Sequence, residues 1–170
     1  TYTGFRQPDV LKPGSFGVAE REEYGRKIYL VPPIGSDFSK AKIEVGIQTF
    51  LLNVTDKQNF VLRNLNFEHA ASPMIEQNNA RGAVSLGLYH DWNLRVKNVL
   101  VEGCNFRWNG GNGLVVTWIE GLTLRRSVMN YNGAGGAGGN LVHNFIWEDN
   151  DISFNQWRGF ETGLGGWGAA

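Results

Sequence analysis

The chain has 170 residues and a formal net charge of zero, with 16 basic and 16 acidic side chains and no long block of one sign. This pattern argues against nucleic acid or an anionic membrane as a partner, and no apolar run approaches the roughly 20 residues of a membrane-spanning helix. A hydrophobic content of 42% suits one packed core, while 23 glycines and 12% aromatic residues favour turn-rich β structure over helical bundles.

The first 48 residues lack the repeat that follows them. Glu22–Tyr24 and Arg26–Pro33 predict a short strand that ends at the proline pair, because proline has no N–H to donate to a sheet. Ile43–Ile47 predicts another strand. We expect residues 1–48 to form a lead-in or cap that packs on the first repeat, since the end of a stack of strands is an unpaired edge that needs covering.

Residues 49–170 contain four eight-residue segments that align without internal gaps. They are Phe60–Phe67, Val99–Phe106, Leu122–Met129 and Phe145–Ile152. The last three begin 23 residues apart, whereas 39 residues separate the first from the second, which fits one period plus an insertion of about 16 residues. Repetition at this period, with alternating apolar residues inside each unit, predicts a β-solenoid.

Equivalent residues of stacked repeats would lie above one another, about 4.8 Å apart. The first and third columns are apolar and predict inward-pointing side chains; they hold Phe60, Val99, Leu122 and Phe145, then Leu62, Val101, Leu124 and Trp147. The fourth column alternates in sign and predicts an outward ladder of ion pairs, formed by Arg63, Glu102, Arg125 and Glu148.

The second half of each repeat supplies three further columns. An apolar eighth column holds Phe67, Phe106, Met129 and Ile152. Two residues later an aromatic column, expected to point inward, holds Trp108, Tyr131 and Phe154, with His69 aligned to it and expected to be buried. Asn109, Asn132 and Asn155 follow and predict a ladder of side-chain amides along the stack.

Each asparagine turn leads into a second short strand. The strand is predicted at Gly82–Leu86, Gly113–Thr117 and Gly159–Thr162. Asn140–His143 is expected to be its counterpart in the remaining repeat, displaced by the glycine-rich segment Gly133–Gly139. That segment is interpreted as a flexible loop, because it lacks the lysine and the following helix of a phosphate-binding loop.

Three runs carry a resemblance to a known family: RKIYLVPP from Arg26, FVLRNLNFEHA from Phe60 and VEGCNFRWNGGNGL from Val101. Together they resemble bacterial right-handed parallel β-helix repeat proteins of the pectin-lyase-like carbohydrate-active superfamily, over roughly residues 20–170. The resemblance implies an all-β fold, a right-handed parallel β-helix (β-solenoid) over residues 49–170 with a non-repeat lead-in over 1–48. It also implies a fragment truncated at both ends, the C-terminus included, an extracellular or periplasmic location and a polysaccharide ligand.

The family's reactions include glycoside hydrolysis, lyase elimination and epimerisation, but no catalytic signature carries over residue by residue. Alternation places Glu161 on the outside of its predicted strand, and His143 lies one repeat away. This carboxylate and imidazole could act as acid and base on a sugar, with Arg158 binding a uronate and Trp157 stacking on the ring. The alternative is that both candidates are solvated surface residues.

A second group of candidates falls in the insertion between the first two repeats. His90 and Asp91, flanked by Trp92, would form a sugar-contacting tip on a loop, where functional residues concentrate. A polar turn anchored by aromatic residues is the alternative. Trp118 lies outside the apolar columns and is expected to serve as a surface platform for a sugar.

No metal site and no cofactor are predicted. Asp149 and Asp151 leave calcium open as an alternative, but the regular ligand spacing of a dedicated calcium loop is missing. Two functions therefore stand. The chain binds or cleaves an extracellular polysaccharide as a lyase or glycoside hydrolase, or it is a non-catalytic assembly module whose uncapped C-terminal edge meets a partner, either another copy or the rest of a larger parent chain.

Overall fold

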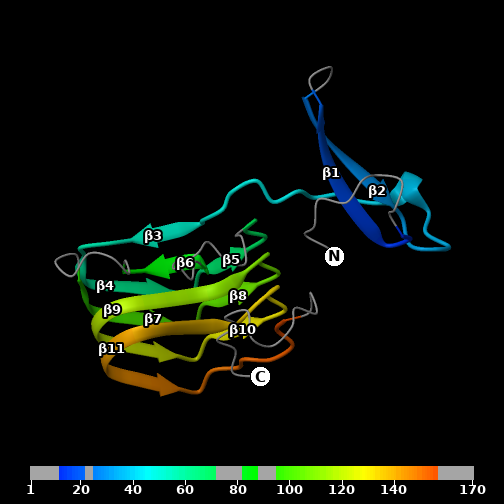
Figure 1. Ribbon diagram of the computed structural model, residues 1–170. Helices are drawn as coiled ribbons and strands as arrows, with labels where there is room; N and C mark the ends of the chain where they lie inside the picture. The colour runs from blue at the N-terminus through cyan, green and yellow to red at the C-terminus, as the bar shows by residue number, and fades with distance from the viewer. Residues whose placement is uncertain (1–11, 22–24, 72–81, 88–94, 157–170) are drawn as a thin grey trace. The chain divides into compact units, whose positions relative to one another are not determined.

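The computed structural model describes residues 12–21, 25–71, 82–87 and 95–156 (Figure 1). The chain divides into two compact units, residues 1–44 and 45–170, each of which is treated by itself. Within the described ranges there is no helix long and apolar enough to cross a membrane.

Unit 1 is built on an antiparallel hairpin. β1 (Ser15–Arg21) pairs with β2 (Gly25–Val31) along its whole length, and β2 ends directly before the prolines, as predicted. A single 3-10 turn, η2 (Phe38–Lys40), follows, capped by the Asp37 carboxylate that accepts a hydrogen bond from Ser39 N at 3.1 Å. Hydrogen bonds from Ser39 lower the pKa of Asp37. The strand predicted at Ile43–Ile47 is wrong: this stretch is irregular and pairs with none of the strands in the described ranges.

Unit 2 consists of short strands that recur from repeat to repeat. The first repeat has β3 (Leu52–Val54), β4 (Gln58–Arg63) and β5 (Asn66–Glu68). The second has β6 (Gly82–Leu86), β7 (Val96–Glu102) and β8 (Asn105–Arg107). The third has β9 (Asn112–Arg125) and β10 (Val128–Asn130), and the fourth begins with β11 (Ala137–Glu148).

Equivalent strands of successive repeats pair in parallel in the predicted register. Phe60 pairs with Val99, Val99 with Leu122, and Leu122 with Phe145, which confirms the 39- and 23-residue offsets. β9 and β11 are long because each spans two sides of the repeat, and they bend between them (Figure 1). The result is an almost entirely β arrangement of parallel sheets, one of them curled, which is consistent with a β-solenoid.

The 16 extra residues of the second repeat are two insertions rather than one. In the strand register Ala70 is equivalent to Asn109, and Gly82 is equivalent to Asn112. Gly82 stands twelve positions after Ala70, whereas Asn112 stands only three positions after Asn109. Ten residues separate Leu86 from Val96, where three separate Val116 from Ile119. Nine additional residues therefore precede β6 and seven follow it. His90, Asp91 and Trp92 belong to the second insertion, outside the described residues.

The core lies between the sheets and is made of the predicted apolar columns. Val101, Phe106, Leu124 and Met129 are fully or almost fully buried, and the rings of Phe67 and Phe106 stack at 5.1 Å. The fourth repeat is more open. Phe145 and Trp147 stand in inward columns, but Trp147 is 42% exposed because β11 has one strand beside it in the described part of the chain.

The glycine-rich segment Gly133–Gly139 is a loop only over residues 133–136, and it displaces no strand. Ala137–Gly139 forms the start of β11 and pairs with Leu114–Val116 at the 23-residue offset. Glycine is required there because a Cβ on Gly139 would lie 1.9 Å from the Val116 carbonyl oxygen. Close stacking of backbones, rather than flexibility, explains this composition.

The aromatic column stacks as predicted but points outward. Trp108 lies 4.5 Å from Tyr131 and Tyr131 lies 5.2 Å from Phe154, ring centre to ring centre and nearly parallel, yet Trp108 is 49% exposed. His69, in the same column, is exposed as well, so its predicted burial is wrong. Trp108 has φ of +59°, and a left-handed residue breaks the alternation on which the inward prediction depended.

Candidate functional site

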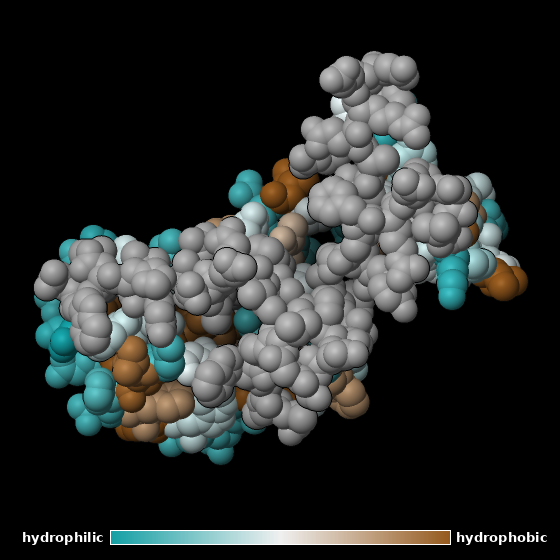
Figure 2. All heavy atoms as spheres, viewed as in Figure 1, coloured by the Kyte–Doolittle hydropathy of each residue, from teal (hydrophilic) through white to brown (hydrophobic). Residues whose placement is uncertain are grey.

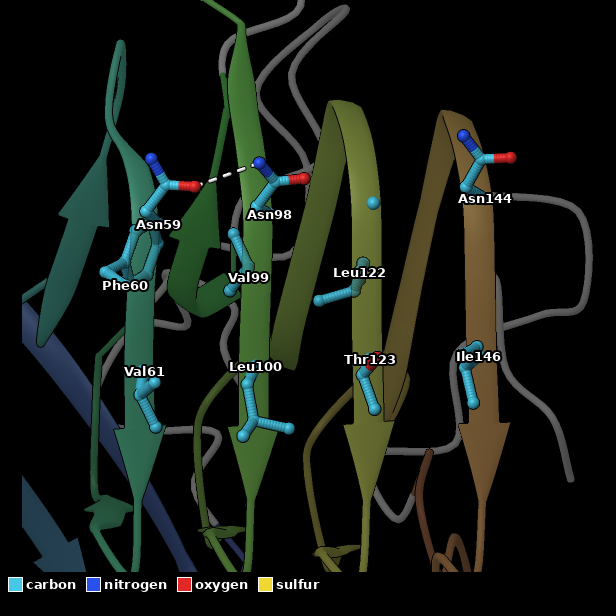
Figure 3. Close-up of a pocket in the computed structure, with 11 residues that line it drawn as sticks. Asn59, Phe60, Val61, Asn98, Val99, Leu100, Leu122, Thr123, Asn144 and Ile146 are labelled. Atoms are coloured by element: carbon cyan, nitrogen blue, oxygen red, sulfur yellow. Dashed lines mark hydrogen bonds between the residues drawn. The ribbon is translucent and has the colours of Figure 1, made fainter.

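The outer surface of strands β4, β7, β9 and β11 carries the candidate site; we call it the β4–β11 face. It holds a shallow groove of about 480 Å³ (Figure 3). One row of side chains in the groove crosses all four strands and consists of Val61, Leu100, Thr123 and Ile146. In the space-filling view, apolar side chains reach the surface among polar ones on the side where β9 and β11 bend (Figure 2).

A row of amides borders the groove on the N-terminal side of the apolar row. Asn59, Asn98 and Asn144 are exposed and stand at left-handed positions, with φ of +58°, +52° and +54°. Asparagine tolerates this conformation and holds its amide outward. Asn98 Nδ2 donates to Asn59 Oδ1 at 2.9 Å (Figure 3). Gly121 interrupts the row on β9.

The predicted ion-pair ladder borders the other side of the groove and is confirmed. Glu102 accepts from Arg63 Nε at 2.7 Å and from Arg125 Nε at 2.9 Å, and Arg125 Nη1 lies 3.5 Å from Glu148 Oε1. Arg126 adds a contact to Glu102 that the sequence columns did not predict. The carboxylate of Glu102 is buried, so its charge is offset by guanidinium groups rather than by water.

A third row lies just before the amides. Gln58, Lys97, Glu120 and His143 are neighbours in the strand register. Lys97 Nζ lies 3.3 Å from Glu120 Oε2, and the exposed His143 stands beside Glu120 on the next strand. This row combines a cation, a carboxylate and an imidazole along the stack.

Among the sequence-predicted site residues, the structure describes two. His143 is exposed on the β4–β11 face, as expected. Trp118 is 9% exposed, so it is not the free surface platform that was expected; the Arg95 guanidinium lies over its ring at 5.8 Å. Its φ of +55° again breaks the alternation.

The other candidates lie outside the described residues: Glu161, Asp91, His90, Arg158, Trp157 and Trp92. The structure describes other members of the sequence column to which Glu161 was assigned. Ser85 and Val115 occupy it and are buried, although neither belongs to the central core cluster. The structure therefore does not bring His143 together with any other predicted catalytic residue in the ranges it describes.

The carboxylates of this face are engaged in ion pairs, whereas hydrolysis of a glycosidic bond needs two carboxyl groups free to act on the sugar. Glu102 and Glu148 both bind the Arg125 guanidinium, at 2.9 Å and 3.5 Å. Glu120 precedes Arg125 by five residues of β9, roughly 16 Å of extended chain. Over the described ranges, no group of three His, Cys, Asp or Glu side chains could hold a metal ion.

Sequence reasoning missed the amide row and the partnership of Glu120 with Lys97. The signal was present: extending the columns two residues towards the N-terminus aligns Asn59 with Asn98 and Lys97 with Glu120. Those positions carry no apolar residue and so stood outside the pattern that defined the repeat.

No family model matches the chain, and no curated protein and no solved structure gives a significant match to it. What the geometry defines is the coarse class: an almost entirely β protein with stacked parallel strands and a polar-rimmed groove on one face.

Proposed function

We propose that the chain is a right-handed parallel β-helix of the pectin-lyase-like type that binds an extracellular polysaccharide along the β4–β11 face. The observation that carries the proposal is the arrangement of this face in rows across the strands, with exposed amides beside an apolar strip. Strands are spaced about 4.8 Å apart, so a polymer lying across them meets equivalent side chains at a regular interval.

The chemistry of the two rows suits a carbohydrate. The amides of Asn59, Asn98 and Asn144 offer both donors and acceptors to hydroxyl groups. Val61, Leu100 and Ile146 offer apolar contact to the C–H faces of a sugar ring. The exposed aromatic stack is less suited to this task, because the faces of Tyr131 are covered by Trp108 and Phe154.

Binding is tested with the full chain and a panel of neutral and uronate-containing polysaccharides, by retardation in affinity gels and by calorimetry. Asn98→Ala should weaken binding about fivefold, the loss of roughly one hydrogen bond. The matched control is Asn105→Ala, which removes a similar amide pair, to Asn66 at 2.7 Å, away from the groove. Failure of every polysaccharide to bind, or equal effects of the two substitutions, would overturn the proposal.

Cleavage is the second candidate, and the observation favouring it is the exposed His143 beside Glu120. A carboxylate next to an imidazole can hold it in position for proton transfer. Assays for new reducing ends and for unsaturated products distinguish hydrolysis from elimination. His143→Ala should abolish either activity, while Gln58→Ala, in the same row, should leave it unchanged.

A further inference from the structure

The first and fourth repeats of unit 2 have the same spacing. Leu52 and Ala137, equivalent in the register, each stand eight residues before the start of the next apolar column, at Phe60 and Phe145. Asn66 and Asp151 each follow that column by six residues. Asn66 pairs with Asn105 of β8, and Asp151 pairs with Val128 of β10. The two insertions are confined to the second repeat, so the outer repeats are congruent.

Among the described strands of unit 2, these two repeats lie at the ends of the stack. In the described part of the chain β4 pairs only with β7, and β11 only with β9. Their inward side chains are correspondingly less buried: Phe60 and Leu62 are half-buried and Phe145 is exposed, whereas Leu122 and Leu124 of the third repeat are almost fully buried. Both edges therefore present backbone groups and apolar side chains to a further strand.

The charges of the two edges are complementary. The ladder ends on Glu148 at the β11 edge and begins on Arg63 at the β4 edge, with side chains 48% and 55% exposed. Arg63 of a second copy placed beside Glu148 would continue the alternation of sign that the ladder shows inside one chain. The same placement sets Asn144 beside Asn59, extending the amide row.

We propose that copies of this chain associate head to tail, with the β11 edge of one copy paired in parallel with the β3–β4 edge of the next, Phe145 beside Phe60 and Glu148 beside Arg63. Because the two edges differ, the contact is heterologous and adds copies in a row rather than closing a dimer. One charged residue of the β4 edge, Lys57, aligns with the inward-pointing Val96 and Ile119 of the next repeats. Lys57 is exposed, and its long aliphatic stem lets the ammonium group lie outside the interface.

The first test is sedimentation of the full chain over a range of concentrations. The wild-type chain should form dimers and longer species as concentration rises, and a chain that stays monomeric overturns the proposal. Trp147→Glu places a charge against the proposed interface and should weaken association at least about tenfold. Leu100→Glu is the matched control: it changes an apolar residue on the outer face of β7, which is paired on both sides, and should leave association unchanged.

Mixing two variants tests the polarity of the contact. Trp147→Glu blocks the β11 edge and Leu62→Lys blocks the β4 edge, so each variant alone should be monomeric. Their mixture should form one-to-one dimers, because each supplies the edge that the other has lost. A mixture that stays monomeric, or variants that self-associate as wild type does, contradicts the head-to-tail arrangement.

A crosslink keeps the proposal testable if either edge variant fails to fold. Asn59→Cys and Asn144→Cys change exposed strand positions, and the proposed register brings their Cα atoms to the spacing of neighbouring strands, within reach of a disulfide. Under mild oxidation, a mixture of these two variants should give a covalent dimer. Asn98→Cys with Asn144→Cys should not, because β7 is paired on both sides. Equal crosslinking of both mixtures, or of neither, overturns the register.

Discussion

Asn132 and Asn155 are joined through their side chains: Asn132 Nδ2 donates to Asn155 Oδ1 at 3.0 Å. The same oxygen accepts from the Asn132 backbone N–H at 3.0 Å, and Asn132 Nδ2 also donates to the Phe106 carbonyl oxygen at 2.9 Å. Asn109 repeats this pattern one repeat earlier, with its own Nδ2 2.9 Å from Asn132 Oδ1. Each amide thus ties a turn to the repeats on both sides.

Substituting Asn132 should cost stability because its side chain is fully buried and all its polar atoms are bonded. Asn132→Ala leaves Asn109 Nδ2 and the Phe106 carbonyl short of partners, and we expect a loss of about 1–3 kcal/mol in the free energy of unfolding. Urea unfolding measures it. Asn105→Ala, at a ladder position open to solvent, should lose far less, and a loss near zero at Asn132 would reject the buried ladder.

The two ion pairs between β7 and β9 should differ in strength. Glu102→Gln removes a buried carboxylate bonded to three part-exposed arginines, Arg63, Arg125 and Arg126, and should lower the free energy of unfolding by about 1–3 kcal/mol. Solvent screens the part-exposed arginines, so the loss should be smaller than for a fully buried ion pair. Glu120→Gln breaks a half-exposed pair with Lys97 and should cost less than about 1 kcal/mol. Urea unfolding compares them, and equal losses would contradict the assigned burial.

Burial raises the pKa of the Cys104 thiol, whose Sγ lies 3.5 Å from the Leu62 carbonyl oxygen. In the unfolded chain the thiol ionises near pH 8.5, and above that pH the unfolded state loses its proton first. The contribution of the neutral thiol is therefore complete below about pH 8.5 and is lost as pH rises further. The stability difference between wild type and Cys104→Ala should shrink between about pH 7 and pH 10. A constant difference would exclude a raised pKa.

Gly139→Ala should destabilise the protein although alanine ordinarily suits a strand better than glycine. The new Cβ would lie 1.9 Å from the Val116 carbonyl oxygen and 2.6 Å from its Cγ2, so β9 and β11 must separate locally. We expect a loss of about 1–3 kcal/mol, measured by urea unfolding. A gain in stability would mean that this glycine does not lie against β9.

The columns of the repeat were readable from the sequence because burial and charge act on the same residues at every turn. The apolar columns of Val101 and Leu124, the ladder through Glu102 and the amides of Asn109 and Asn132 all follow from spacing alone. The errors share one cause. Left-handed residues, such as Trp108 and Trp118, change the direction of the next side chains, and nothing in a two-residue alternation marks which tryptophan will adopt that conformation.

The candidate site was less accessible to sequence reasoning. His143 was placed on an outer face correctly, but its neighbour Glu120 lies 23 residues earlier in the chain and became a partner only through strand pairing. Trp118 was expected at the surface and is buried, because burial depends on what the rest of the chain packs over it.

The sequence alone therefore determined the period, the register and the inward columns, since these are properties of one-dimensional spacing that every repeat must share. The tertiary structure decided three further features. It split the insertion around β6, turned the aromatic stack outward and made Gly136–Gly139 part of the close approach between β9 and β11. Each of these depends on backbone dihedrals and distances between strands, which act in three dimensions and leave no fixed spacing in the sequence.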